Sequence, residues 1–148
     1  MVKALVIAAV AWPLLLGGAL EARVHQTAPV FVTAMYVAAS RVCHQRPARS
    51  FHTAGVRWPV CARCSGLYVG GAFGALAAVT WLRRRFRSPR LLVWLAVAAV
   101  PTAVTYVIEK GGLVAVGNDA RFLAALPLGA LAALVIIRTA AGPAASIE

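Results

Sequence analysis

The sequence predicts an all-α, multi-pass membrane protein, a transmembrane helical bundle of about four spans with one short interfacial or re-entrant helix. Of its 148 residues, 61% are hydrophobic and only 13% are charged, whereas soluble domains carry about 25% charged residues. The mean hydropathy is +0.81. The 15 Lys and Arg and four Asp and Glu residues are too few to cover a water-soluble body of this size. We therefore expect a single integral membrane domain over residues 1–148.

Long stretches without charged residues place the predicted spans. A helix needs about 20 mostly apolar residues to cross the hydrocarbon core, within a range of about 17–25. Stretches of this kind predict spans near 4–20, 64–82, 91–108 and 122–138. The last one ends on Arg138, whose long aliphatic stem can reach the headgroups.

The first two apolar segments each have an alternative interpretation. The first has Lys3 before an apolar run, as in a secretory signal peptide. That run is long and no small-x-small cleavage site precedes Glu21, so a retained helix is favoured. In the second segment Pro29 narrows the apolar run to a length that rises only about 15 Å as a helix. We therefore expect an interfacial or re-entrant helix near 28–41 rather than a span across 24–40.

A stripe of small residues lies at the start of the span near 64–82. Gly66, Gly70 and Gly74 recur every four residues, and this interval lets another helix backbone approach closely in lipid. The stripe predicts a tight helix contact, either inside the chain or in a homo-oligomer.

The net charge of +11 would suggest nucleic-acid binding in a soluble protein, but the positions of the charges give another explanation. A short, dense basic loop separates two predicted spans and contains Arg83, Arg84, Arg85, Arg87 and Arg90. Such loops are usually cytoplasmic, so no nucleic acid is needed to explain them. With four spans in the cell membrane, both termini are then cytoplasmic and the loop at 41–66 is extracytoplasmic.

The three cysteines of the chain, Cys43, Cys61 and Cys64, all lie in that loop region. A Cys-x-x-Cys pair lets two thiolates converge on one ion, and a third Cys with one His completes a set typical of zinc, with iron as an alternative. His44 neighbours Cys43 and is the first candidate for the fourth ligand. His52 and His25 are the alternatives.

The same cysteines support two other interpretations. Pro59 precedes the span, which places Cys61 and Cys64 at a helix N-terminus, where the helix dipole and Arg63 stabilise thiolates. Such a pair is also typical of a membrane thiol-disulfide oxidoreductase. The third interpretation is three small apolar residues with no shared role. The odd number of cysteines and the nearby histidines favour the metal.

Polar residues from two loops are expected on the same side of the membrane as the cysteines. The arginine fork suits phosphate and carboxylate groups, so one hypothesis is a small anion or an anionic lipid held beside the metal. The alternative is that these arginines anchor at headgroups or pair with Asp119 and Glu109. The residues concerned are Arg46, Arg49, Arg63 and Arg121, with Tyr68 and Asn118.

These motifs resemble those of a family of small prokaryotic predicted membrane proteins, domain of unknown function 2085. The resemblance covers about residues 40–130 and implies a membrane location and a joint role for the Cys, His and Arg residues. It departs at Thr105, where the family usually has an Asp, with only Glu109 nearby. The residues that carry it are Cys43-His44-Gln45, Arg49-Ser50-Phe51, Pro59-Val60-Cys61-x-Arg63-Cys64-x-Gly66-x-Tyr68-x-Gly70, Pro101, Asn118-x-x-Arg121 and Gly129.

No catalytic residue is assigned from the sequence. A phosphate loop, a His-Glu-x-x-His motif, a serine nucleophile elbow and a dinucleotide fingerprint are all absent from the chain. With four acidic residues in all, acid-base catalysis by paired carboxylates is disfavoured.

Overall fold

The computed structural model describes residues 1–82 and 90–141. Its elements are the helices α1 (Val2–Val24) and α2 (Pro29–Val42), the 3₁₀ turn η1 (Pro47–Arg49), the strands β1 (His52–Thr53) and β2 (Val56–Arg57), and the helices α3 (Ala62–Leu82), α4 (Leu91–Lys110) and α5 (Asn118–Ala141). Among the described residues, α1, α3, α4 and α5 are long and apolar enough to cross a membrane. The predicted all-α fold with four spans is confirmed.

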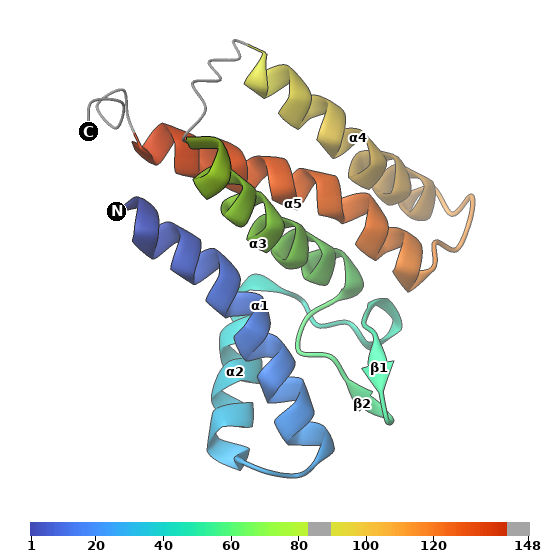
Figure 1. The fold of residues 1–148 in the computed structure, drawn as a ribbon. Coiled ribbons are helices and arrows are strands. Elements are labelled where there is room, and N and C mark those ends of the chain that lie inside the picture. Colours follow the sequence, from blue (N-terminus) through green and yellow to red (C-terminus); the bar gives the residue numbers. More distant parts are fainter. Residues whose placement is uncertain (83–89, 142–148) are drawn as a thin grey trace.

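The four long helices form a bundle with α3 and α5 side by side at its centre (Figure 1). Helix α4 packs against α5, and α1 packs against α3 on the other side. The start of α3, the end of α4 and the start of α5 lie at one end of the bundle, with the short β-hairpin beside them (Figure 1). The loop between α2 and α3 therefore meets the loop between α4 and α5.

The glycine stripe is covered by α5. A Cβ atom added to Gly66, Gly70 or Gly74 would collide with a backbone carbonyl oxygen of α5, and one added to Gly129 would collide with the carbonyl oxygen of Leu67. The two backbones therefore touch without intervening side chains, as expected for small residues at this interval. Of the two predicted alternatives, the contact inside the chain is the one formed, and it occupies the face that a homo-oligomer would need.

Helices α1 and α2 form a hairpin. Helix α1 continues through Pro13, and α2 begins at Pro29, which suits the first helical position because proline has no amide hydrogen to leave unpaired. With 14 residues, α2 rises about 21 Å, less than the thickness of the hydrocarbon core. Leu16 and Ala19 of α1 pack against Met35 and Ala39 of α2, in a core that also contains Cys43 and Val60.

The predicted cytoplasmic basic loop falls mostly outside the described residues. Arg83, Arg84, Arg85 and Arg87 lie there, and Arg90 is the exposed residue that directly precedes α4.

Candidate metal centre

The connection between α2 and α3 is fastened by the side chain of Gln45. Its amide nitrogen donates hydrogen bonds to the carbonyl oxygens of Tyr36 and Pro59, both at 2.8 Å. The backbone of Gln45 adopts a φ of 46°, in the left-handed region that few non-glycine residues occupy. The carbonyl oxygen of Gln45 accepts a 2.7 Å hydrogen bond from Nη1 of Arg57. Gln45 thus joins the end of α2 to the residues just before α3 and keeps Cys43 beside Cys61.

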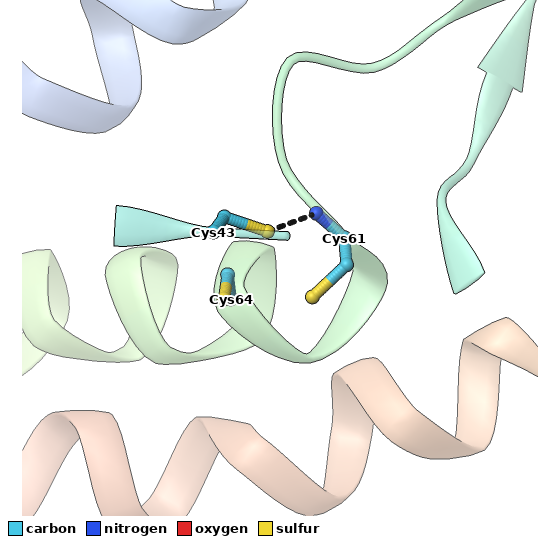
Figure 2. Close-up of side chains that lie close together, drawn as sticks. All are labelled: Cys43, Cys61 and Cys64. Atoms are coloured by element: carbon cyan, nitrogen blue, oxygen red, sulfur yellow. Dashed lines mark hydrogen bonds between the residues drawn. The ribbon is translucent and has the colours of Figure 1, made fainter. Parts of the chain in front are cut away.

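The sulfur atoms of Cys43, Cys61 and Cys64 gather at the first turn of α3 (Figure 2). They all lie within 4.8 Å of one another, and all three cysteines are free thiols. Cys43 is buried, and the other two are half-buried. The Cys43 sulfur accepts hydrogen bonds from the backbone N–H groups of Cys61, at 3.2 Å, and Gln45, at 3.5 Å. The hydrogen bond from Cys61 holds the Cys43 sulfur against the residue that directly precedes α3.

Cys61 is the residue directly before α3, and its surroundings favour a thiolate. Hydrogen bonding from the Cys64 side chain lowers the pKa of Cys61 to about 5, against the opposing effect of burial. The backbone N–H groups of Cys64 and Arg63 and the side chain of Cys43 also contribute to this lowered pKa. The two N–H groups are free donors of a helix N-terminus. The position of Pro59 in the sequence predicts that helix start.

No histidine nitrogen joins the three sulfurs within the described ranges 1–82 and 90–141. His44 is exposed but lines the same cavity as the cysteines. His25 hydrogen-bonds Glu21 at 2.9 Å near the end of α1, and His52 is exposed on β1. Of the three predicted candidates, His44 is therefore the one placed beside the thiols.

Three arginines from three parts of the chain converge on Glu109, near the end of α4. Arg49 lies 2.6 Å from Oε1 of Glu109, and Arg121 lies 3.1 Å from the same oxygen. Arg63 lies 3.5 Å from Oε2. The side chain of Glu109 is only 11% exposed, so this carboxylate connects η1, α3 and α5 in a region of low water access.

Arg121 and Arg63 differ in how fully they are hydrogen-bonded. Arg121 donates to both carboxylate oxygens of Glu109, to Oδ1 of Asn118 at 2.6 Å and to the carbonyl oxygen of Ala48. Arg63 donates to Thr105 over 3.4 Å, and its buried Nε has no hydrogen-bond partner in the part of the chain that the structure describes. Thr105 stands where the family resemblance leads us to expect an acid, so Arg63 meets a hydroxyl group there.

A cavity of about 500 Å³ separates the three thiols from this ion cluster. Its wall includes all three cysteines, His44, the four predicted arginines and the pair Glu109 and Lys110. The structure therefore brings together the two groups of residues that the sequence singles out separately. The arginines concerned are Arg46, Arg49, Arg63 and Arg121.

The two remaining predicted site residues take other positions. Asn118 donates a 3.1 Å hydrogen bond to the carbonyl oxygen of Ser50 and accepts one from Arg121, so it attaches the start of α5 to the cysteine-bearing loop. Tyr68 packs edge-on against Trp12, with ring centroids 6.1 Å apart, and borders an apolar cavity of about 220 Å³ beside α1. Neither side chain lines the larger cavity.

The sequence alone gives Gln45 no role beyond its place in a motif, and it presents Glu109 only as a pairing partner for the arginines and as the acid nearest to Thr105. The signal for Gln45 was its place in the Cys43-His44-Gln45 motif. The signal for Glu109 was that it is one of only four acidic residues, close to a predicted membrane boundary that is rich in arginine.

Two curated relatives are each similar to about 60% of the chain. A Methanocaldococcus jannaschii protein is 34% identical over 91 residues, which are 60% of this chain and 57% of that protein. A Methanothermobacter thermautotrophicus protein is 31% identical over 88 residues, covering 60% of this chain and 78% of the relative. Both are described as uncharacterized. The chain thus spans just over half the length of the first relative. No solved structure gives a significant match.

A family model described as a predicted membrane protein matches residues 43–135. The matched range begins at Cys43 and includes the other two cysteines, Glu109 and all the arginines of the ion cluster. It also includes α3, α4 and most of α5, the helices that form the end of the bundle at which the cavity lies. The chain therefore belongs to the family of membrane proteins called domain of unknown function 2085.

Proposed function

We propose that this membrane protein binds a transition-metal ion, with zinc as the first candidate and iron as the second, through the thiolates of Cys43, Cys61 and Cys64. The observation that carries the proposal is the convergence of three free sulfur atoms within 4.8 Å of one another. Zn–S bonds of about 2.3 Å place two sulfurs of a tetrahedral site about 3.8 Å apart. Side-chain adjustments of about 1 Å would therefore suffice to close the three thiolates around one ion.

The fourth ligand of this ion would come from the cavity side. His44 is the candidate from the chain, because it follows Cys43 and lines the cavity. With His44 bound, the four protein ligands would form a closed Cys₃His set of the structural type. With a cavity ligand in place of His44, the metal would serve as a Lewis acid toward that ligand.

Metal analysis of detergent-purified protein tests this function. We expect about one zinc or iron ion per chain, lost in Cys43→Ser, Cys61→Ser and Cys64→Ser. His25→Ala and His52→Ala are matched controls and keep the metal, since those imidazoles lie outside the cavity. Protein that contains no metal, and whose three thiols remain free after exposure to zinc and to iron, would contradict the proposal.

A thiol-disulfide exchange function is the second candidate. It is favoured by the free state and the proximity of Cys61 and Cys64 at a helix N-terminus. Exchange would require a reversible Cys61–Cys64 disulfide, which acid quenching of cells followed by alkylation with a mass-tagged maleimide would detect. A pair that stays reduced in both wild type and Cys43→Ser during oxidant treatment excludes this candidate.

For the orientation, we propose cytoplasmic termini for this chain and an extracytoplasmic thiol loop. The support is the basic segment that ends at Arg90, since short arginine-rich loops are retained in the cytoplasm. Labelling of Cys61 by a membrane-impermeant maleimide, in intact cells treated with a metal chelator, tests this orientation. Labelling only after permeabilisation would reverse the assignment.

A further inference from the structure

We propose that the cavity between the cysteines and the Glu109 cluster is a binding site for a phosphate group, held chiefly by Arg63 and Arg49. This goes beyond the proposed metal site, because the phosphate-binding groups are guanidiniums and not thiolates. The volume of the cavity, about 500 Å³, lies within the range of about 300–1,000 Å³ that is usual for small-molecule sites.

The charge of the cavity wall calls for an anion. Five positively charged side chains line it, against the carboxylate of Glu109 and the thiolate of Cys61: Arg46, Arg49, Arg63, Lys110 and Arg121. Arg46 and Lys110 are exposed, so water screens their charges. The side chains of Arg63 and Arg121 are only 16% and 10% exposed, and two guanidiniums with so little water access share one carboxylate.

Arg63 is the guanidinium with hydrogen-bonding capacity left over. Arg121 uses its donors on Glu109, Asn118 and Ala48. Among the described residues, the polar contacts of the Arg63 side chain are long, 3.4 Å to Thr105 and 3.5 Å to Glu109, and its Nε is buried without a hydrogen-bond partner. Its guanidinium also lies over the ring of Tyr106, 5.7 Å from the centroid. A buried unpaired donor is costly, and an incoming oxyanion would remove that cost.

Arg49 supplies a second guanidinium for the same oxyanion. Arg49 and Arg63 contact opposite oxygens of the Glu109 carboxylate, and both line the cavity, so two guanidiniums border the cavity beside one carboxylate. A phosphate group can accept hydrogen bonds from two arginine forks at once and carries up to two negative charges. Because Arg63 stands between Cys61 and Cys64 in the sequence, a phosphate bound there lies beside the thiols.

The test measures binding of radiolabelled inorganic phosphate to detergent-purified protein at low ionic strength. Binding of phosphatidic acid in nanodiscs is followed in parallel by native mass spectrometry, with phosphatidylcholine as the lipid control. We expect Arg63→Gln and Arg49→Gln to weaken binding about tenfold or more. Arg63→Lys keeps the charge but loses the fork, and it should bind at an intermediate level. Arg41→Gln is the matched control, because Arg41 is exposed and lies outside the cavity wall.

The outcomes separate this site from the metal site and identify the source of the phosphate. Binding that persists in metal-free Cys61→Ser supports the phosphate site whatever the metal analysis gives. If inorganic phosphate binds and displaces phosphatidic acid, the ligand comes from water; if only phosphatidic acid binds, with the same dependence on Arg63, it comes from the bilayer. Two results overturn the proposal. One is equal weakening of binding in Arg41→Gln. The other is the absence of saturable binding of either probe to wild-type protein whose thermal melting curve shows that it is folded.

Discussion

The guanidinium of Arg121 contacts both carboxylate oxygens of Glu109, with Nε 3.3 Å from Oε2 and Nη2 3.1 Å from Oε1. This paired contact joins the end of α4 to the start of α5 across the loop that separates them. Both side chains are nearly buried, so each neutralises a charge that water could not easily solvate.

Removing one partner of this pair should destabilise the protein strongly. Glu109→Gln leaves three guanidiniums without their carboxylate, and an uncompensated buried charge costs about 3–5 kcal/mol. We expect a loss near 3 kcal/mol, measured as the free energy of unfolding in mixed detergent micelles. Asp119→Asn is the control: Asp119 is exposed in the first turn of α5, and its loss should cost under about 1 kcal/mol. Equal effects of the two substitutions would mean that the cluster adds little to stability.

The contact between α3 and α5 predicts a sharp difference between two glycines. Gly70→Ala places a methyl group on the carbonyl oxygen of Leu126, and the overpacking should lower the free energy of unfolding by about 1–3 kcal/mol. Gly18→Ala meets no atom of the described residues within 4 Å outside its own helical turn and should be neutral or stabilising by about 0.5–1 kcal/mol, since alanine favours a helix. Detergent unfolding of both variants measures the difference. A neutral Gly70→Ala would be incompatible with direct backbone contact.

Gln45 should control the affinity of the thiol cluster for metal without being a ligand. Gln45→Glu replaces an N–H₂ donor with oxygens that face the carbonyl oxygens of Tyr36 and Pro59, so the two segments that carry Cys43 and Cys61 should separate. We expect zinc affinity to fall by about 10–100-fold, as for supporting residues of other metal sites. Competition with a chromogenic chelator measures it.

Gln45→Ala gives the matched comparison for that prediction. It removes the hydrogen bonds without adding repulsion, so its effect should be smaller than that of Gln45→Glu. Identical zinc affinity in wild type and both variants would show that Cys43 and Cys61 are aligned without Gln45.

The reactivity of Cys61 should extend to unusually low pH in metal-free protein. Because its pKa is lowered to about 5, the thiolate persists as the pH falls and disappears only near pH 5, whereas an ordinary thiol loses it near pH 8.5. The alkylation rate with iodoacetamide should therefore be half-maximal near pH 5. Trypsin cleavage after Arg63 places Cys61 and Cys64 on different peptides, so mass spectrometry follows each thiol separately.

The control for this pH dependence is Cys64→Ala. Hydrogen bonding from Cys64 is the largest cause of the lowered pKa of Cys61, so the midpoint should move to higher pH in this variant. A wild-type midpoint near 8.5 would mean that the cluster doesn't stabilise the Cys61 thiolate.

The helices could be predicted from the sequence because the bilayer imposes a local rule. A stretch without charges must be long enough to cross, and the four spans follow from reading such stretches one at a time. The turn between α1 and α2 could also be predicted, since Pro29 interrupts the apolar run. The pairing of the helices was harder to predict. Gly70 indicates a close helix contact, but only the fold identifies α5 as the partner.

From the sequence, the cysteines and the arginines could be placed on one side of the membrane, but direct contacts could be predicted only between residues that are neighbours in the chain. The spacing of Cys61 and Cys64 puts two thiols on one helical turn, whereas the distance between Glu109 and Arg49 depends on how α4 lies against the loop before α3. The hydrogen bonds by which Gln45 holds the loop depend on its left-handed backbone conformation, which the residue type does not predict. Such long-range relationships arise from packing, which a pattern within one segment does not encode.

The position of Glu109 late in the sequence affects when the ion cluster can form during synthesis. Arg49 and Arg63 precede α4 in the sequence, so they leave the ribosome and reach the membrane surface before their carboxylate partner exists. Until α4 has inserted, those guanidiniums are solvated by water or paired with lipid phosphates and dissolved anions. The cluster closes when the second half of the protein arrives, and the last helix pair then completes a site that the first half has already begun.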